Sequence, residues 1–160
     1  MKDTNNRVRA VIRNGSKILC FRANNNNRKY STKNYFLPGG HIKKNECSYD
    51  AIIRELKEEI DGISSILSCN ILGVFELKWY DITYVSHTEI NFVYEIQVTY
   101  INSPNEIKTM DNYLDAEWIE ETDIKSGQII LLPSEISENI NLWSSIDSNI
   151  RSQVVFSSGF

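Results

Sequence analysis

The sequence PGGHIKKNECSYDAIIRELKEEIDG, residues 38–62, begins with two adjacent glycines after its proline and ends in a segment rich in acidic side chains. From about Ser48 to Ile60, apolar residues recur every three or four positions, which predicts an α-helix. Glu55, Glu58 and Glu59 lie one turn apart on this helix, and like charges at that spacing repel one another. The expected apolar stripe consists of Tyr49, Ile53, Leu56, Ile60 and Ile63.

The three glutamates should point away from this stripe, toward whatever the Gly39-Gly40 loop holds. A glycine pair lets the backbone approach a ligand or ion closely, and Glu46 adds a fourth acid just before the helix. Clustered carboxylate oxygens suit Mg²⁺ or Mn²⁺, which share their coordination shell with water and substrate phosphates. Arg54 stands four residues before Glu58 and can hold that acid in place. The alternative is a solvated, Glu-rich helix surface that binds nothing.

This stretch resembles the signature of the Nudix hydrolases, G-x₅-E-x₇-R-E-U-x-E-E-x-G-U, in which U is aliphatic. Gly40 takes the first position and Glu46 follows after five residues. After seven intervening residues come Arg54, Glu55, Leu56, Lys57, Glu58 and Glu59. The resemblance implies an α/β/α sandwich around this helix.

Two positions depart from the family pattern. Asp61 stands where the late glycine is expected, and Gly62 follows one place further on. We therefore expect either a left-handed conformation at Asp61 or a helix one residue longer that Gly62 closes. Cys47 replaces the usual serine or threonine, so Ser48 is expected to cap the helix one place later.

Nudix enzymes use a divalent metal to hydrolyse a pyrophosphate bond in a nucleoside diphosphate linked to another group. Such an ion neutralises phosphate charge and lowers the pKa of bound water. By resemblance, Glu58 and Glu59 bind Mg²⁺ or Mn²⁺ beside the Gly40 carbonyl, and Glu55 binds metal or deprotonates the water. Supporting roles fall to Glu46, beside the metal ligands, and to Arg54, which positions a carboxylate. The catalytic set is then Arg54, Glu55, Glu58 and Glu59.

The signature stretch from Gly40 to Gly62 is called the box below. Candidates for substrate binding lie outside this box. Arg22 resembles a position that meets substrate phosphates, and the rings of Tyr35 and Tyr80 could stack on a nucleobase. Glu120 could accept hydrogen bonds from a purine edge, and Asp111 is the preferred further acid in the loop before Trp118. The alternative for each aromatic residue is burial in the core, and for Arg22 and Asp111 an ordinary place on the surface.

The rest of the chain reads as strands around this helix. Asn14-Gly15 between two apolar runs predicts a β-hairpin, and an exposed Asn-rich loop follows over about 23–34. A second helix is expected over 133–146, and residues 151–160 form either a frayed tail or an added edge strand. Strands outnumber helices, which predicts an α+β fold with a mixed sheet between helices, in a single domain over 1–160. The further strands are expected over 66–77, 82–86, 88–101 and 115–121.

Composition limits the function classes. The 160 residues carry a net charge of −4, which argues against a surface that holds nucleic acid by neutralising phosphates. The three cysteines are expected to be free thiols, and no apolar stretch is long enough to span a membrane, so we expect a cytoplasmic protein. It should be a monomer or homodimer that acts on a small nucleotide.

The expected substrate is a nucleoside triphosphate, its deoxy form or a modified nucleotide, because the chain is compact. Nucleotide sugars, ADP-ribose and dinucleoside polyphosphates are the alternatives. A module that binds nucleotides without cleaving them would be expected to lack acids of the box, whereas all four glutamates are present. An RNA-end processing enzyme would need a basic groove, which the acidic balance does not favour.

Overall fold

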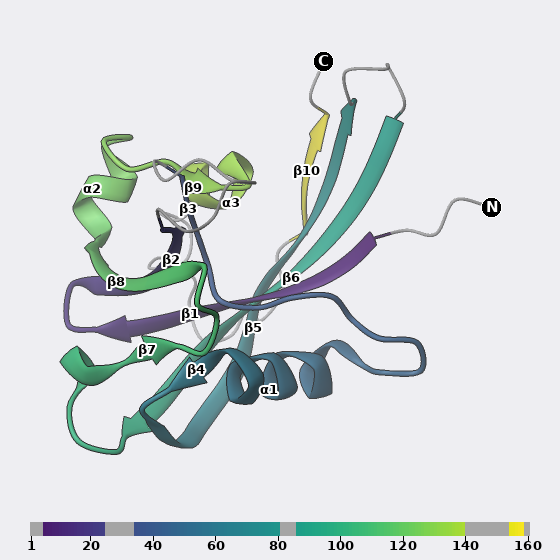
Figure 1. The fold of residues 1–160 in the computed structure, drawn as a ribbon. Helices are drawn as coiled ribbons and strands as arrows, with labels where there is room; N and C mark the ends of the chain where they lie inside the picture. Colours follow the sequence, from purple (N-terminus) through teal and green to yellow (C-terminus); the bar gives the residue numbers. More distant parts are fainter. Residues whose placement is uncertain (1–4, 25–33, 81–85, 140–153, 159–160) are drawn as a thin grey trace.

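A computed structural model describes the chain over residues 5–24, 34–80, 86–139 and 154–158 (Figure 1). Within these ranges, the side chains of residues 79, 80, 86 and 154–158 lie outside the description. The elements follow in the order β1 (Asn5–Asn14), β2 (Lys17–Ala23), β3 (Tyr35–Phe36), α1 (Ser48–Glu59), β4 (Ile60–Asp61), β5 (Ile63–Tyr80), β6 (Ser86–Tyr100), η1 (Pro104–Glu106), β7 (Lys108–Thr109), β8 (Leu114–Glu120), α2 (Glu121–Lys125), β9 (Leu131–Leu132), α3 (Ser134–Glu138) and β10 (Val154–Ser158).

The described strands form a mixed sheet with α1 on one side and α2 and α3 on the other (Figure 1). Its strand order is β10-β5-β6-β1-β2-β3-β9, and β8 also pairs with β2. The β1–β6, β5–β10 and β3–β9 pairs are parallel, and the remaining pairs are antiparallel. A separate two-stranded pair joins β4 to β7. The predicted α+β class, with a mixed sheet between helices, is confirmed.

The predicted hairpin at the start of the chain is β1–β2. Asn14 pairs with Lys17 across the turn, and Gly15 adopts a positive φ of 61°, which a glycine accepts without strain. The predicted strands over 66–77, 88–101 and 115–121 correspond to β5, β6 and β8, and β5 and β6 are longer than expected.

Other predictions fall partly outside the described residues. Residues 25–33 of the Asn-rich loop, 82–85 of one expected strand and 140–146 of the expected second helix are among them. The start of that helix is α3, with Ile136 fully buried. Near the C-terminus, β10 runs parallel to Val74–Lys78 of β5. The edge strand is therefore the correct alternative for residues 154–158, and the frayed tail is wrong there.

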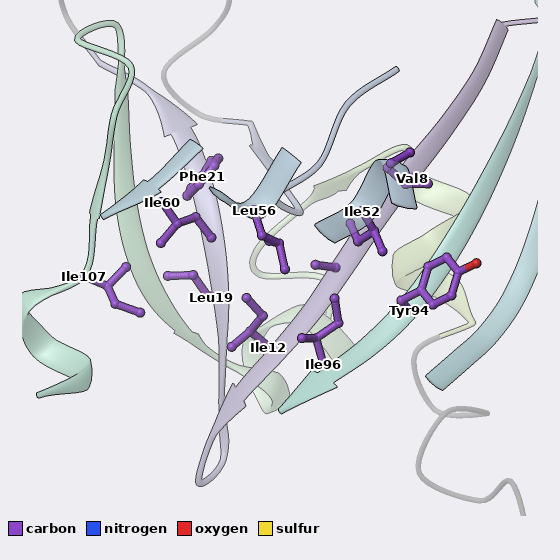
Figure 2. Packing of buried hydrophobic residues seen from close by; sticks show 12 residues of the cluster. Val8, Ile12, Leu19, Phe21, Ile52, Leu56, Ile60, Tyr94, Ile96 and Ile107 are labelled. Atoms are coloured by element: carbon purple, nitrogen blue, oxygen red, sulfur yellow. The ribbon is translucent and has the colours of Figure 1, made fainter. Parts of the chain in front are cut away.

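The buried face of α1 differs from the expected stripe. Ala51, Ile52 and Leu56 are buried, whereas Tyr49 is 51% exposed and Ile63 belongs to β5. Figure 2 shows Ile52 and Leu56 directed into the core formed with β1, β2 and β6. The predicted stripe is confirmed at Leu56 and Ile60, which are buried, and at Ile53 and Ile63, which pack against the same core. It is wrong at Tyr49, and it left out Ile52, which is fully buried.

The start of α1 is also different from the prediction. Cys47 is the N-cap residue, and its Sγ accepts a hydrogen bond from the Asp50 amide at 3.5 Å. Ser48 is the first helical residue, and its hydroxyl instead hydrogen-bonds the Tyr94 hydroxyl at 2.7 Å. The thiol therefore takes over the capping position that serine or threonine would normally fill.

The helix ends without a left-handed residue. Ile60 follows Glu59 in an extended conformation (φ −119°, ψ 121°), and β4 leads straight into a pairing with β7. Asp61 is not left-handed, and Gly62, at φ 101°, lies beyond the helix against Ile107. Both expected ways of ending the helix were therefore wrong. The end is held instead by the Met110 amide, which donates to the Glu59 carbonyl at 2.8 Å.

A second core covers the opposite face of the sheet. Val11, Cys20 and Val93 contribute to it from the sheet, and Ile124 of α2 and Ile136 of α3 cover it. Residues alternate between the two faces along each strand, so β1 sends Val8, Ala10 and Ile12 toward α1 and its other side chains toward this second face.

Candidate active site

The Pro38–Gly40 segment runs alongside β1 as an extra, irregular strand. The Val8 amide donates to the Gly40 carbonyl at 2.9 Å, and the Ala10 amide donates to the Pro38 carbonyl at 2.8 Å. Gly39 adopts φ 134°, which side-chain-bearing residues rarely accept. These bonds fix the glycine pair against the sheet and beside α1.

Glu55 and Glu59 lie against this glycine pair. A Cβ atom on Gly40 would come within 2.5 Å of the Glu55 carboxyl carbon, so only glycine leaves room for that carboxylate. The Gly39 amide donates to Glu59 Oε2 at 3.0 Å. The sequence predicted that the acids point outward. Glu55 and Glu59 do face the Gly39-Gly40 loop, as predicted, but they lie partly buried at the rim of the core face, because that face is centred on Ile52.

Burial raises the pKa of Glu59 to about 7. The negative charges of Glu55 and Asp111 add to this effect, while the Gly39 amide and the Arg9 cation oppose it. The carboxyl group of Glu59 therefore gains or loses its proton near neutral pH, and it lies beside the carboxylate of Glu55.

We expect Glu59 to make the metal-free protein less stable as the pH rises from about 4.5 to about 7. Below this window the carboxyl group is protonated in both states, and within it the unfolded chain loses the proton first, because the folded pKa is the higher one. The free energy of unfolding should fall by at most about 3 kcal/mol and then level off. Urea unfolding in EDTA at pH 5 and pH 8 measures this. Glu59→Gln should remove that part of the difference, and an identical pH dependence in both proteins would contradict it.

Arg54 supplies a positive charge that offsets the repulsion among the neighbouring glutamates. Its Nε and Nη2 donate to the two oxygens of Glu46 at 2.7 and 2.9 Å. Its Nη1 donates to Glu55 Oε1 at 2.6 Å and to Glu58 Oε2 at 3.0 Å. Nη2 also donates to the His41 carbonyl at 3.0 Å, which ties the helix to the loop after the glycines. One guanidinium group therefore positions three carboxylates.

Glu46 and Glu58 differ in how far this pairing occupies them. Arg54 and the Lys43 amide bind both oxygens of Glu46 and lower the pKa of Glu46 to about 2. Glu58 has a side chain that is 53% exposed, and its second oxygen lies 3.6 Å from Lys43 Nζ. Glu46 is thus placed to hold Arg54, while Glu58 remains accessible from solvent.

Asp111 lies close to the end of α1. Its neighbour Met110 bonds the Glu59 backbone, and the charge of Asp111 contributes to the raised pKa of Glu59. Asp111 Oδ1 accepts from the Tyr113 amide at 2.7 Å, which shapes the turn before β8. Of the predicted residues outside the box, Asp111 is the one that lies near the carboxylate of Glu59.

Arg22 and Tyr35 form a second group on the neighbouring strands. The Arg22 guanidinium lies 5.8 Å from the centre of the Tyr35 ring, and β2 and β3 pair these two residues directly. Glu117 of β8 accepts a hydrogen bond from the Tyr35 hydroxyl at 2.9 Å and pairs with Arg22. Glu117 was not among the predicted residues. The alternation of Asp115 and Glu117 in the expected strand was the signal that could have found it.

Of two further predicted substrate residues, Glu120 is not brought to this region, and the side chain of Tyr80 is not described. Glu120 accepts from the Ser16 hydroxyl at 2.7 Å, beside the β1–β2 turn. That turn is about 20 Å along β1 from Val8, where the glycine loop is bonded. Tyr80 pairs through its backbone with Ser86 at the end of β5, and its side chain lies outside the described residues.

The NUDIX domain family model matches residues 3–139 of the chain. The chain belongs to the Nudix family. Nudix hydrolases act on nucleoside diphosphate-linked compounds. None of the curated proteins compared with the sequence matches it. Within the described residues, no helix is both long and apolar enough to cross a membrane.

Solved structures share this Nudix fold. A NUDIX hydrolase from Nitrosomonas europaea superposes with a TM-score of 0.65 at 24% identity, over 89% of this chain and 90% of that one. A MutT protein from Methanosarcina mazei Go1 gives 0.64 at 20% identity, over 91% and 96%. The NUDIX domain of Shewanella oneidensis NrtR, complexed with ADP ribose, gives 0.64 at 17% identity, over 89% of each chain.

Nudix enzymes generally use a divalent metal, and the oxygen donors beside the glycine pair fit such an ion. Burial raises the pKa of Glu59, and the charge of Glu55 adds to this effect, so a bound cation would favour the ionised form of Glu59. The Gly40 carbonyl, bonded to Val8, has a second lone pair for an ion. Among the described residues, no three acidic, histidine or cysteine side chains form a ready-made metal cluster. Arg54 holds Glu55 and Glu58, which would have to shift if they were to bind an ion together with Glu59.

Replacing Arg54 with glutamine is expected to weaken Mn²⁺ binding and kcat/KM by about 10–100-fold, the usual loss when a group that positions metal ligands is removed. The reason is that Glu55 and Glu58 lose the group that fixes their orientation. Calorimetric titration with Mn²⁺ and steady-state kinetics measure the effect. Arg13→Gln, which breaks an arginine–glutamate pair at the far end of β1, is the matched control. Unchanged Mn²⁺ binding in Arg54→Gln would contradict the assignment.

Proposed function

We propose that the protein hydrolyses a pyrophosphate bond in a nucleoside triphosphate, its deoxy form or a modified nucleotide, with Mg²⁺ or Mn²⁺ bound by its box glutamates. The observation that carries the proposal is the placement of Glu55 and Glu59 against the Gly39-Gly40 backbone, with Arg54 holding the neighbouring carboxylates. These residues would hold a divalent ion, which would supply charge neutralisation of the diphosphate and a lowered pKa of bound water.

The box residues then have separate roles. Glu55 and Glu59 bind the ion, with Glu58 and the Gly40 carbonyl as further ligands. Because its pKa is about 7 before metal binds, Glu59 must give up its proton for the ion, so metal affinity should rise with pH through neutrality. Glu46 and Arg54 position these ligands, and Asp111 adds negative charge beside them.

Arg22 and Tyr35 are the residues that support nucleotide binding beside this site. A guanidinium stacked near a tyrosine ring offers both a phosphate ligand and a flat surface for a base. Glu117 holds both side chains and thereby orders the pair before substrate arrives. We leave Glu120 out of the proposed site because it lies beside the β1–β2 turn.

Two alternatives concern the substrate and the activity. ADP-ribose is a candidate because it occupies a NUDIX domain of the same fold, and nucleotide sugars and dinucleoside polyphosphates share its diphosphate. A module that binds nucleotides without cleaving them is the second alternative. The intact set of Arg54 and its three glutamates favours the hydrolase over that module. Three free thiols, at Cys20, Cys47 and Cys69, support a reducing compartment such as the cytoplasm.

The deciding experiment is incubation with a panel of nucleoside triphosphates, oxidised nucleotides, ADP-ribose, nucleotide sugars and dinucleoside polyphosphates, with Mg²⁺ or Mn²⁺. Chromatography of the products identifies the bond that is cleaved. We expect cleavage of a pyrophosphate bond that EDTA abolishes, with a triphosphate or modified nucleotide the best substrate. A preference for ADP-ribose would select the alternative, and nucleotide binding without any cleavage would select the non-catalytic module.

A further inference from the structure

Arg9 is a buried cation in the middle of β1 that the box does not include. It is only 8% exposed, and strand alternation places it on the face opposite Val8 and Ala10. Its Nη1 donates to the Leu37 carbonyl at 3.2 Å. Its Nε is buried and has no hydrogen-bond partner among the described residues. Burial lowers the pKa of Arg9 to about 10, so the side chain remains charged at neutral pH.

Among the carboxylates whose charge acts on Arg9, which are Glu89, Glu59 and Glu55, Glu89 has the largest effect, and it is bonded to other residues. Glu89 accepts hydrogen bonds from Asn5 Nδ2 at 3.1 Å and Asn91 Nδ2 at 2.8 Å, and it pairs with Arg7 Nε at 3.0 Å. Within the described part of the chain, no carboxylate lies within 4.0 Å of the Arg9 guanidinium nitrogens. A buried cation without a counter-ion destabilises a fold, and a buried donor without an acceptor is rare in native proteins.

Arg9 lies between the two halves of the proposed site. The Leu37 carbonyl that it binds is two residues from Tyr35 on one side and two residues from Gly39 on the other. Tyr35 belongs to the Arg22 group, and Gly39 is bonded to Glu59. A diphosphate that joins a nucleoside on the first half to an ion on the second would follow the segment between Tyr35 and Gly39, whose Leu37 carbonyl Arg9 binds.

We propose that Arg9 binds a phosphate oxygen of the diphosphate and supplies the counter-charge on the sheet side of the substrate. This inference rests on the proposed function and deepens it, because it names a residue outside the box that recognises the reacting group. A guanidinium suits this role, since its donors form a rigid fork that matches phosphate oxygens. The Nε–H of Arg9 has no acceptor among the described residues, so it is free to donate a hydrogen bond to a phosphate oxygen when substrate binds.

Arg9→Met tests this role without requiring turnover. Methylenediphosphonate, a non-hydrolysable diphosphate, is titrated calorimetrically in saturating Mg²⁺, and Mn²⁺ alone is titrated separately. We expect diphosphonate affinity to fall by about 10–100-fold, because a charge-assisted hydrogen bond is lost. Mn²⁺ affinity should change much less than diphosphonate affinity, because the charge of Arg9 has only a minor influence on Glu59 compared with burial. The melting temperature should stay the same or rise, since a buried unpaired charge is replaced by an apolar side chain. Arg9→Lys should recover part of the affinity.

Arg13→Met is the matched control, because it removes an arginine from the same strand and face. Arg13 is paired with Glu95 and Glu121, so its loss should lower the melting temperature and leave diphosphonate affinity unchanged. Unchanged diphosphonate affinity in Arg9→Met would overturn the proposal. So would a joint fall in melting temperature and Mn²⁺ affinity, which would make Arg9 a support for the glycine loop.

The two proposals can fail separately. Wild-type protein that cleaves no nucleotide but binds the diphosphonate through Arg9 would reject the proposed hydrolysis and support the binding role. Wild-type protein that cleaves nucleotides, with Arg9→Met unaffected in KM and in diphosphonate binding, would reject the role of Arg9 alone.

Discussion

Glu59→Gln is expected to lower kcat by about 10²–10³-fold, because a metal that stabilises transition-state charge contributes several kcal/mol to phosphoryl-bond cleavage. Glutamine keeps the shape of the side chain and can still accept a hydrogen bond from the Gly39 amide. It removes the anionic oxygen that would bind the ion. Steady-state kinetics on the best substrate of the panel, with Mn²⁺ titration beside it, measure both consequences.

The variant should remain folded, which separates lost chemistry from lost structure. Glu59 is partly buried with a raised pKa, so a neutral side chain there should match or exceed wild-type stability at pH 8. Glu120→Gln is the matched control, because it makes the same change on β8 beside the β1–β2 turn. It should leave kcat within about twofold of wild type. Full turnover in Glu59→Gln would reject Glu59 as a metal ligand.

Gly39→Ala is expected to cost about 3 kcal/mol or more of folding free energy and to abolish activity. An alanine Cβ would lie 2.9 Å from the carbonyl carbon of the fully buried Val8, and closer still to its oxygen. The residue would also have to adopt φ 134°, which strains any side-chain-bearing residue. Thermal and urea unfolding measure the loss, with an expected fall in melting temperature of about 10 °C.

Gly15→Ala is the control for backbone strain alone. Gly15 has φ 61° in the β1–β2 turn, and a Cβ there would meet no atom within 4 Å. It should cost only about 1–2 kcal/mol and leave activity unchanged. If both alanine variants lose similar stability, the close approach of Gly39 to β1 is not what requires glycine.

The helix and its acids could be predicted because they depend on local sequence. The spacing from Gly40 to Glu59 and the helical periodicity indicate α1 within one residue of its observed end, and the family model then confirms the fold. Asn14-Gly15 likewise predicts the hairpin, since a turn with positive φ needs residues of this kind. These signals lie within a few residues of the structure that they determine.

Contacts between distant segments could not be predicted in this way. Glu117 meets Tyr35 because β2 pairs with both β3 and β8, and Glu89, whose charge acts on Arg9, is bonded to Asn5, Arg7 and Asn91. The face on which α1 is buried is also set by its packing partners, so Ile52 outweighs Tyr49. Each of these depends on strand register, which a single sequence does not reveal.

The tie between Glu59 and the segment before β8 affects how the motif could be transplanted. The Glu59 carbonyl is bonded by Met110, and β4 pairs with β7, so residues 108–110 hold the C-terminal end of α1. A graft of residues 38–62 onto another scaffold would carry all four glutamates but not this clamp. Engineers who borrow the motif should therefore move both segments together, or build a new brace for the last turn of the helix.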